Sequence, residues 1–194
     1  MKVAIVKYNA GNVESVKNAL NRLGVEPILT DDATELKTAD KVIFPGVGEA
    51  SSAMNYLRTR NLDETIKSLR QPVLGICLGM QLLCEFSEEN STKCLGILPG
   101  KVRKFESKTL KIPQIGWNNV FNLQSKLFEG IEENSYVYFV HGFYVAANEA
   151  TIATAEYEIE FSAAIQHENF YAVQFHTEKS GAVGERILEN FLKI

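Results

Sequence analysis

Short apolar runs alternate with amphipathic stretches through the first 84 residues, and this alternation most constrains the fold. Residues 2–6 predict a strand, and apolar residues at 13–23 recur at helical spacing until Gly24 ends the run. The same alternation predicts strands at 25–29, 41–44 and 73–76, and helices at 34–39, 51–69 and 78–84. Strands that alternate with helices form right-handed βαβ units, so we expect a parallel sheet.

The helical pattern fades after residue 85, where shorter β-like runs replace it. These runs predict antiparallel strands added to the first part, at residues 102–105, 119–122, 136–140 and 151–155. Residues 161–166 and 171–175 predict a hairpin whose second arm ends at His176, and residues 183–192 predict a final helix. We therefore expect one α/β domain over residues 1–194, a three-layer sandwich with a mostly parallel central sheet and an appended antiparallel β section.

Composition excludes several classes of protein. The net charge of −4 argues against a nucleic-acid partner, and the short apolar run at the N-terminus is too small for a signal peptide or a membrane span. We expect a soluble cytoplasmic protein with three reduced cysteines, no metal and no cofactor. One local cluster is basic and predicts either a solvated hairpin face or a rim for a partner or anion, namely Lys101, Arg103, Lys104, Lys108 and Lys111.

A G-x-C-x-G motif at residues 75–79 lies between the apolar strand 73–76 and the helix that follows. This is the context of a nucleophile elbow, in which a sharp turn holds the nucleophile and small neighbours let the chain pass close beneath it. The helix N-terminus favours a thiolate at Cys77, and the N–H of Leu78 points toward an oxyanion formed beside the sulfur. We interpret Cys77 as a nucleophile; the alternative is a buried cysteine in a glycine-rich turn.

A thiol nucleophile needs a base, and the chain has three histidines. His176 follows an apolar strand, and Glu178 falls on the same side of the chain if the backbone stays extended, so the carboxylate can orient the imidazole. His141 also follows a predicted strand and is the competing base, although it has no carboxylate nearby in sequence. His167 lies in the predicted hairpin turn, where we expect a surface role.

Two further features have less specific interpretations. Cys84 lies on the same predicted helix as Cys77 and is expected in the core, whereas the sequence assigns no role to Cys94. The glycine-rich turn at 44–48 departs from a phosphate-binding loop, and Glu49 would meet an arriving anion there. We therefore expect this turn to donate a backbone N–H to an oxyanion hole opposite Leu78.

Several segments together resemble the class I glutamine amidotransferase family, and most closely the members that serve as glutaminase subunits of imidazole glycerol phosphate synthase. The segments that carry this resemblance are Tyr8-Asn9-Ala10-Gly11-Asn12, Pro45-Gly46-Val47-Gly48, Gly75-Ile76-Cys77-Leu78-Gly79-Met80-Gln81-Leu82-Leu83, Gly116-Trp117-Asn118, Tyr138-Phe139-Val140-His141 and Gln174-Phe175-His176-Thr177-Glu178-Lys179-Ser180. The resemblance implies a glutaminase that forms a cysteinyl thioester and passes ammonia to a β/α-barrel cyclase partner in a heterodimer for histidine biosynthesis.

The resemblance also implies roles for particular residues. Cys77 is expected to be the nucleophile, His176 the base and Glu178 its orienter, as the spacing also indicates. Substrate contacts are expected from Gly46, Val47, Gly48, Leu78, Gln81 and Glu85. Three departures from the family pattern are Thr177 in place of proline, Gln114 in place of histidine, and Glu49-Ala50 after the glycine-rich turn.

Two other functions stay open at this point. A glutaminase that serves a different synthase would share the same Cys-His-Glu set and differ only in its acceptor. A non-catalytic interaction module with a vestigial elbow would keep its function after Cys77→Ala.

Overall fold

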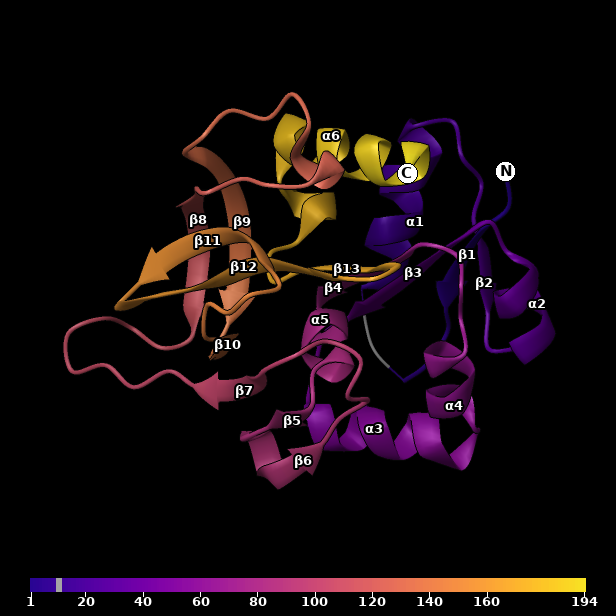
Figure 1. Cartoon of the computed structure of the whole chain (residues 1–194), viewed down its shortest axis with the longest axis horizontal. Coiled ribbons are helices and arrows are strands. Elements are labelled where there is room, and N and C mark those ends of the chain that lie inside the picture. The colour runs from indigo at the N-terminus through magenta and orange to yellow at the C-terminus, as the bar shows by residue number, and fades with distance from the viewer. Residues whose placement is uncertain (10–11) are drawn as a thin grey trace.

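A computed structural model of the chain describes residues 1–9 and 12–194, and its centre is a seven-stranded sheet in the order β11-β12-β13-β4-β3-β1-β2 (Figure 1). The strands are β1 (Val3–Val6), β2 (Ile28–Thr30), β3 (Lys41–Gly46), β4 (Val73–Cys77), β11 (Thr151–Tyr157), β12 (Ile159–His167) and β13 (Phe170–Val173). The neighbours from β13 to β2 pair in parallel, and β12 and β11 pair antiparallel at one edge. The predicted mostly parallel sheet is confirmed.

Helices cover both faces of this sheet (Figure 1). They are α1 (Val13–Arg22), α2 (Ala33–Thr38), α3 (Ala50–Thr59), α4 (Leu62–Lys67), α5 (Leu78–Leu83) and α6 (Gly181–Lys193). Side chains alternate along β1, so Val3 and Ile5 pack in the core with α1 and α6, whereas Ala4 and Val6 pack in the core with α2 to α5. Helices on both faces explain why the parallel strands are apolar throughout.

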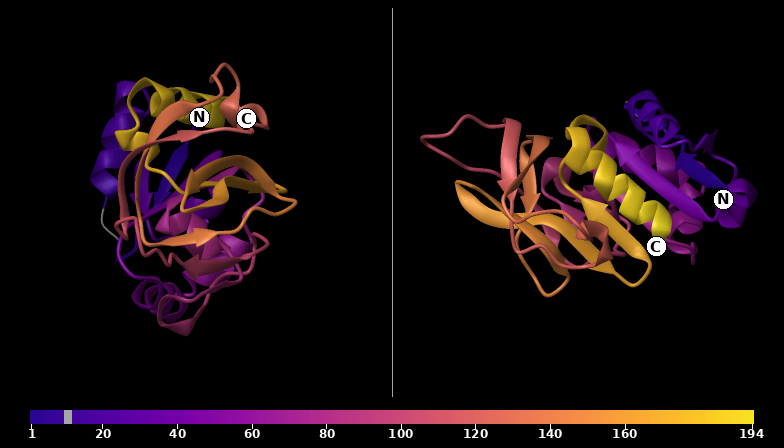
Figure 2. Two further views of the ribbon diagram at one scale, coloured as in Figure 1. Left: turned by 90° about the vertical axis from the view of Figure 1, so that its left-hand side faces the viewer. Right: turned by 90° about the horizontal axis from the view of Figure 1, so that it is seen from above.

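The region between α5 and β11 forms two small sheets. One is the pair β8 (Gln114–Val120) and β9 (Ser135–His141), and the other has the order β10-β7-β5-β6. The strands of the second sheet are β5 (Phe86–Ser87), β6 (Thr92–Lys93), β7 (Lys101–Lys104) and β10 (Phe143–Val145). In the view from above, β8 and β9 lie at the end of the molecule opposite the N-terminus (Figure 2, right).

The appended section was predicted only in part. The β-run at 151–155 is β11, which belongs to the central sheet because β12 pairs with it, and β7 pairs in parallel with β5. The short strands β5, β6 and β10 were not predicted, since two or three residues carry too little periodicity. Strand β8 begins earlier than the predicted run at 119–122, and β2 is shifted to the end of the run at 25–29.

The predicted helix at 51–69 is two helices. Helix α3 ends at Thr59 and α4 begins at Leu62, because Asn61 adopts a left-handed conformation with φ 55°. Asparagine tolerates this conformation better than most residues, so the chain bends here without glycine. Apolar residues recur at spacings of three and four on both sides of the break, which is why the pattern predicted one helix.

The hairpin of β12 and β13 is confirmed, but its second arm ends at Val173 rather than at His176. His176 is still extended, and Thr177–Lys179 form a turn of 3₁₀ helix, so the expected extended path through Thr177 is wrong. No helix among the described residues is both long and apolar enough to cross a membrane.

Candidate active site

The elbow at Cys77 joins β4 directly to α5. Cys77 has φ 54° and ψ −109°, a combination that residues with a side chain rarely adopt, and its side chain is buried. The glycines of the motif make room for this turn. A Cβ on Gly79 would lie 1.8 Å from the carbonyl oxygen of Phe44, and a Cβ on Gly75 would lie 2.7 Å from Leu83 Cδ1. Helix α5 therefore packs directly against β3. This close packing places the Cys77 sulfur at the carboxyl end of the sheet.

His176 and Glu178 form a buried pair beside this elbow. His176 Nδ1 lies 2.8 Å from Glu178 Oε1, and the two side chains are 2% and 0% exposed. The 3₁₀ turn at residues 177–179 folds the carboxylate back onto the ring, so the predicted contact forms by a different backbone path. Because a carboxylate only accepts, Nδ1 carries the proton and Nε2 is left for the sulfur.

Asn12 is a third member of this group that the sequence did not assign. Its amide nitrogen donates to Glu178 Oε1 and lies 3.3 Å from His176 Nδ1. Since Nδ1 already donates to the carboxylate, the second approach is a contact, and the hydrogen bond of Asn12 belongs to Glu178. Asn12 is the residue before α1, so the start of this helix lies against the carboxylate.

The pair favours a charged imidazole. Burial alone would lower the pKa of His176, but hydrogen bonds to Cys77 and Glu178 and their negative charges raise that pKa above its ordinary value. The charge on the His176 imidazole is thus coupled to the charge on the Cys77 sulfur. The arrangement suits a thiolate next to an imidazolium that a carboxylate orients.

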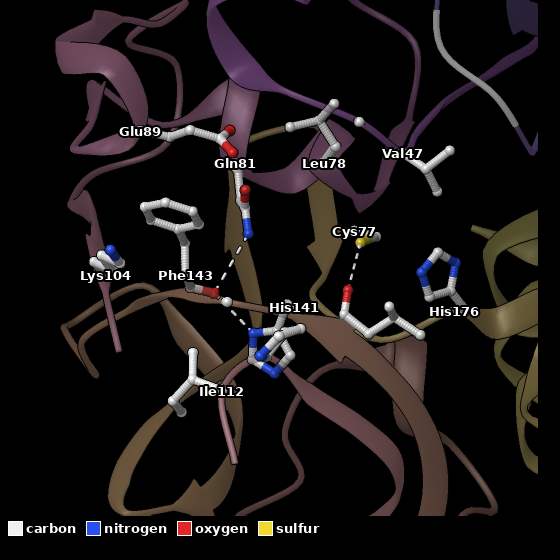
Figure 3. Close-up of a pocket in the computed structure, with 14 residues that line it drawn as sticks. Val47, Cys77, Leu78, Gln81, Glu89, Lys104, Ile112, His141, Phe143 and His176 are labelled. Atoms are coloured by element: carbon white, nitrogen blue, oxygen red, sulfur yellow. Dashed lines mark hydrogen bonds between the residues drawn. The ribbon is translucent and has the colours of Figure 1, made fainter. Parts of the chain in front are cut away.

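A cavity of about 500 Å³ opens over Cys77 (Figure 3). Its lining contains Val47, Gly48, Cys77, Leu78, Gln81, Glu89, Lys104, Ile112, Pro113, Val140, His141, Gly142, Phe143 and His176. Distant parts of the chain therefore meet here. They include the loop after β3, the elbow with α5, the segments next to β8 and β9, and the single residues Glu89, Lys104 and His176. The volume is in the range of small-molecule sites.

His141 also faces this cavity, but it has neutral partners. Its Nδ1 lies 2.7 Å from the carbonyl oxygen of Phe143, and its Nε2 lies 2.8 Å from Gln114 Oε1. A neutral imidazole donates from one nitrogen only, so Nδ1 donates to the carbonyl and the Gln114 amide turns its NH₂ group toward Nε2. Burial lowers the pKa of His141 to about 4. Gln114, which departs from the family pattern, thus caps a neutral histidine in the cavity wall.

The loop after β3 lies next to the elbow. Gly46 pairs with Cys77 in the sheet register, Val47 and Gly48 line the cavity, and Gly48 has φ 114°. Tyr8 is buried and donates from its hydroxyl to the carbonyl oxygen of Pro45, 2.7 Å away. The hydroxyl of Tyr8 therefore fixes the start of the glycine-rich turn, and Val47 and Gly48 line the same cavity as Leu78.

Glu85, expected to contact substrate, is exposed and does not line the cavity. The acidic residue in the lining is Glu89, whose Oε2 accepts a hydrogen bond of 2.7 Å from the N–H of Ala50. Burial raises the pKa of Glu89, while the bond from Ala50 opposes that rise. Glu85 and Glu89 both follow α5 in a short acidic stretch. The short strands β5 and β6 turn the chain there, so that Glu89 faces the cavity and Glu85 faces solvent.

The other cysteines lie in the core away from this cavity. Cys84 is buried near the end of α5, where its sulfur contacts the carbonyl oxygen of Met80, and burial strongly raises its pKa. Burial also raises the pKa of Cys94 to about 11. His167 is exposed at the end of β12. Among the three cysteines, Cys77 is thus the one that faces both a histidine and the cavity.

Two kinds of similarity agree with this geometry. Relatives include the protein called imidazole glycerol phosphate synthase subunit HisH from Bacteroides thetaiotaomicron, 56% identical over all of both chains, and that from Haemophilus influenzae, 48% identical over all of this chain and 98% of the relative. In structure, the chain is similar over its full length to a putative GMP synthase subunit from Thermoplasma acidophilum, with a TM-score of 0.76, 21% identity and 93% of that chain covered. It is also similar to PurLQS from Thermotoga maritima, with a TM-score of 0.74, 18% identity, and 99% and 97% of the two chains covered.

The family described as glutamine amidotransferase class-I matches residues 4–194. Nearly the whole chain is thus accounted for by one family, and the full-length relatives narrow the group further. The chain belongs to the class-I glutamine amidotransferases and, within them, to the HisH subunits of imidazole glycerol phosphate synthase.

Proposed function

We propose that this chain hydrolyses glutamine to glutamate and ammonia in the cytoplasm, and that it passes the ammonia to a cyclase subunit of imidazole glycerol phosphate synthase. The observation that carries the proposal is the common cavity that holds Cys77 and His176, with Glu178 on the far side of the imidazole. The relatives at 48 to 56% identity are named as subunits of that synthase, which supports the choice of acceptor.

The first half of the reaction acylates the enzyme. The Cys77 thiolate attacks the side-chain carboxamide carbon of glutamine, and the carbonyl oxygen becomes an oxyanion. The N–H of Leu78 and a peptide N–H of the Val47-Gly48 turn are the donors we assign to that oxyanion. When the C–N bond breaks, the imidazolium of His176 gives its proton to the nitrogen, and ammonia leaves from a glutamyl thioester.

The second half restores the thiolate. His176 is now neutral and takes a proton from water, which attacks the thioester carbon. Cleavage of the C–S bond releases glutamate and leaves the thiolate beside the imidazolium again. Glu178 keeps Nδ1 protonated in both halves, so Nε2 faces the reacting atoms throughout.

Substrate recognition is assigned to the side of the cavity away from His176. We propose that the carboxylate of Glu89 attracts the ammonium group of glutamine, in place of the expected Glu85, and that Gln81 contributes a side-chain amide. Gly46 supports the turn through its pairing with Cys77 rather than from the lining. The side-chain carboxamide of glutamine then points toward Cys77.

An exposed apolar face next to the cavity is the surface we assign to the cyclase. On one side of the β8–β9 pair, Ile115, Trp117 and Tyr136 are 60%, 55% and 60% exposed, and Trp117 stacks edge-on to Tyr138 at 5.8 Å. The same strand β9 ends in the cavity wall at Val140 and His141. A contiguous exposed apolar patch of this kind marks a protein interface, and a cyclase seated here would receive ammonia directly.

The proposal is tested with a glutamine analogue that alkylates thiols, 6-diazo-5-oxo-L-norleucine, added to the chain together with its cyclase. We expect one adduct at Cys77 by peptide mass spectrometry, protection by glutamine, and no adduct in Cys77→Ala. Labelling at Cys84 or Cys94 instead would contradict the mechanism. Ammonia transfer is then measured with the cyclase and with other ammonia-using synthases, and coupling to one of the latter would reassign the acceptor.

A further inference from the structure

A line of amide groups runs along the cavity wall and continues through the buried Gln174 to the Cys77 sulfur. Gln81 Nε2 lies 3.4 Å from the carbonyl oxygen of Phe143 and 3.0 Å from Gln174 Oε1. Gln174 Nε2 lies 3.9 Å from Cys77 Sγ. Gln174 is fully buried, so water does not compete for these contacts. The mechanism above gives Gln174 no task.

The direction of this line is fixed at its far end. A backbone carbonyl only accepts, so Gln81 must turn its NH₂ group toward Phe143 and, with the other hydrogen, toward Gln174. Gln174 must then offer its carbonyl oxygen to Gln81, which leaves its own NH₂ group for the sulfur. A side-chain amide could face either way by itself, but this one is held with its donor toward Cys77.

We propose that Gln174 is a positioning residue that donates a hydrogen bond to the Cys77 thiolate and holds it in the attacking orientation. The inference rests on the proposed function, because it concerns the reactive state of the same thiol. A donor strengthens when its acceptor is ionised and the surroundings are dry, as they are around this buried amide. The Cys77 sulfur therefore has two hydrogen-bond donors, His176 and Gln174, and Gln174 directly follows β13.

The same line also orients Gln81 toward the substrate. In the described part of the chain, both contacts of the Gln81 side chain use its nitrogen. Its carbonyl oxygen is therefore left to accept a hydrogen bond from the substrate glutamine. Gln174 thus links the orientation of a substrate-binding amide to that of the nucleophile. A change at Gln174 is expected to alter thiol reactivity first and substrate affinity second.

The test is the pH dependence of alkylation of Cys77 by iodoacetamide, with the adduct located by mass spectrometry. Gln174→Glu keeps an oxygen for Gln81 but places an acceptor against the sulfur, so we expect the midpoint of the profile to rise by about one pH unit, a tenfold loss of thiolate at a given pH. Gln174→Met lacks both the amide NH₂ and the amide oxygen and carries no charge, so we expect it to raise the midpoint of the alkylation profile by about half as much. His176 and Tyr8, which interact with the sulfur, are unchanged in both variants, as are the other titratable residues of the cavity lining, His141, Glu89 and Lys104.

A matched control is Gln166→Glu. Gln166 is on β12, where its amide contacts Ser125 and Tyr171 outside the cavity, so the same added charge should leave the midpoint unchanged. A merely structural role for Gln174 would lower the unfolding midpoint of its variants and leave the alkylation profile where it was. An unchanged profile in either folded Gln174 variant overturns the inference.

Failure of the inference is distinguishable from failure of the proposed function. If the profile is unchanged while the glutamine analogue still labels Cys77 and glutamine is hydrolysed, the proposed function stands and Gln174 has no part in it. If the analogue does not label Cys77 of the unaltered chain, the proposed function fails whatever Gln174 does. Hydrolysis by Gln174→Glu is expected to lose kcat with a smaller change in KM.

Discussion

Two buried histidines face the same cavity from different parts of the molecule, and their surroundings give them opposite properties. His176 follows the central sheet and meets a carboxylate and a thiol, which raise its pKa. His141 ends β9 in the small β8–β9 pair and meets a backbone carbonyl and an amide, so burial lowers its pKa to about 4. As whole residues they are 1% and 5% exposed, so burial alone does not separate them.

The difference shows that the partner, and not the depth, decides which histidine can carry a proton at neutral pH. A buried imidazolium is stable only next to negative charge, and only the His176 region supplies it. Both residues follow a strand and both were candidate bases in the sequence. The carboxylate two residues after His176 was the one difference visible there.

The largest test of this comparison exchanges each histidine for glutamine. His176→Gln is expected to lose about a thousandfold in glutaminase kcat, because the acid for ammonia and the base for water disappear together. The matched control, His141→Gln, keeps a donor for Phe143 and is expected to lose less than about tenfold. Glutamate release by the complex with the cyclase measures both, and equal losses would break the comparison.

The two histidines should also give opposite dependences of stability on pH. His141 has a depressed pKa in the folded state, so its contribution is present above its unfolded value of 6.5 and is lost as pH falls toward about 4, a change of about 3 kcal/mol. His176 has a raised pKa, so its contribution is present below 6.5 and is lost as pH rises through the folded value.

Urea unfolding at a series of pH values, with each glutamine variant compared with the unaltered chain, measures these slopes. His141→Gln is expected to flatten the loss of stability on the acid side, and His176→Gln to flatten it on the alkaline side. Slopes of the same sign for both would show that their environments are not opposed.

Removing the carboxylate sharpens the comparison further, because it makes the surroundings of His176 resemble those of His141. Glu178→Gln is expected to reduce glutaminase kcat about a hundredfold, and to move the high-pH limb of the rate profile to lower pH. The direction follows because Glu178 raises the pKa of His176, so the imidazolium is lost earlier without it. A limb that stays in place would mean that Glu178 does not act through His176.

The smallest expected effect is at Asn12. Asn12→Gly keeps the left-handed backbone of φ 77° but removes the donor to Glu178, and we expect a two- to tenfold loss of kcat, about the worth of one hydrogen bond. Asn122→Gly is the control, since Asn122 has φ 55° and donates to Thr154 elsewhere. Equal losses in the two variants would point to a general effect on folding.

Much of the central sheet and the elbow could be predicted from the sequence, because both are local patterns. An apolar strand, a glycine on each side of Cys77 and a helical stripe lie within about a dozen residues. The closeness of His176 and Glu178 was predicted as well, although the turn at residues 177–179 replaces the expected extended chain. Residues two apart in sequence can come into contact through several backbone conformations, so the contact was easier to predict than its geometry.

The rest of the site depends on contacts between distant segments. Asn12 reaches Glu178 across 166 positions and Gln81 reaches Gln174 across 93, and no periodicity reports such pairs. Glu89 replaced Glu85 in the cavity because two very short strands, β5 and β6, turn the chain there. Tertiary packing, rather than local preference, selects these residues.

Gly79 limits how the site can change over time. Because a single methyl group there would overlap the carbonyl of Phe44, any larger residue would push α5 away from β3 and carry Leu78 and Gln81 with it. A homologue can therefore lose this activity through a larger residue at the position of Gly79 while it keeps Cys77, His176 and Glu178. A sequence comparison that checks only these three reacting residues would classify such a homologue as active.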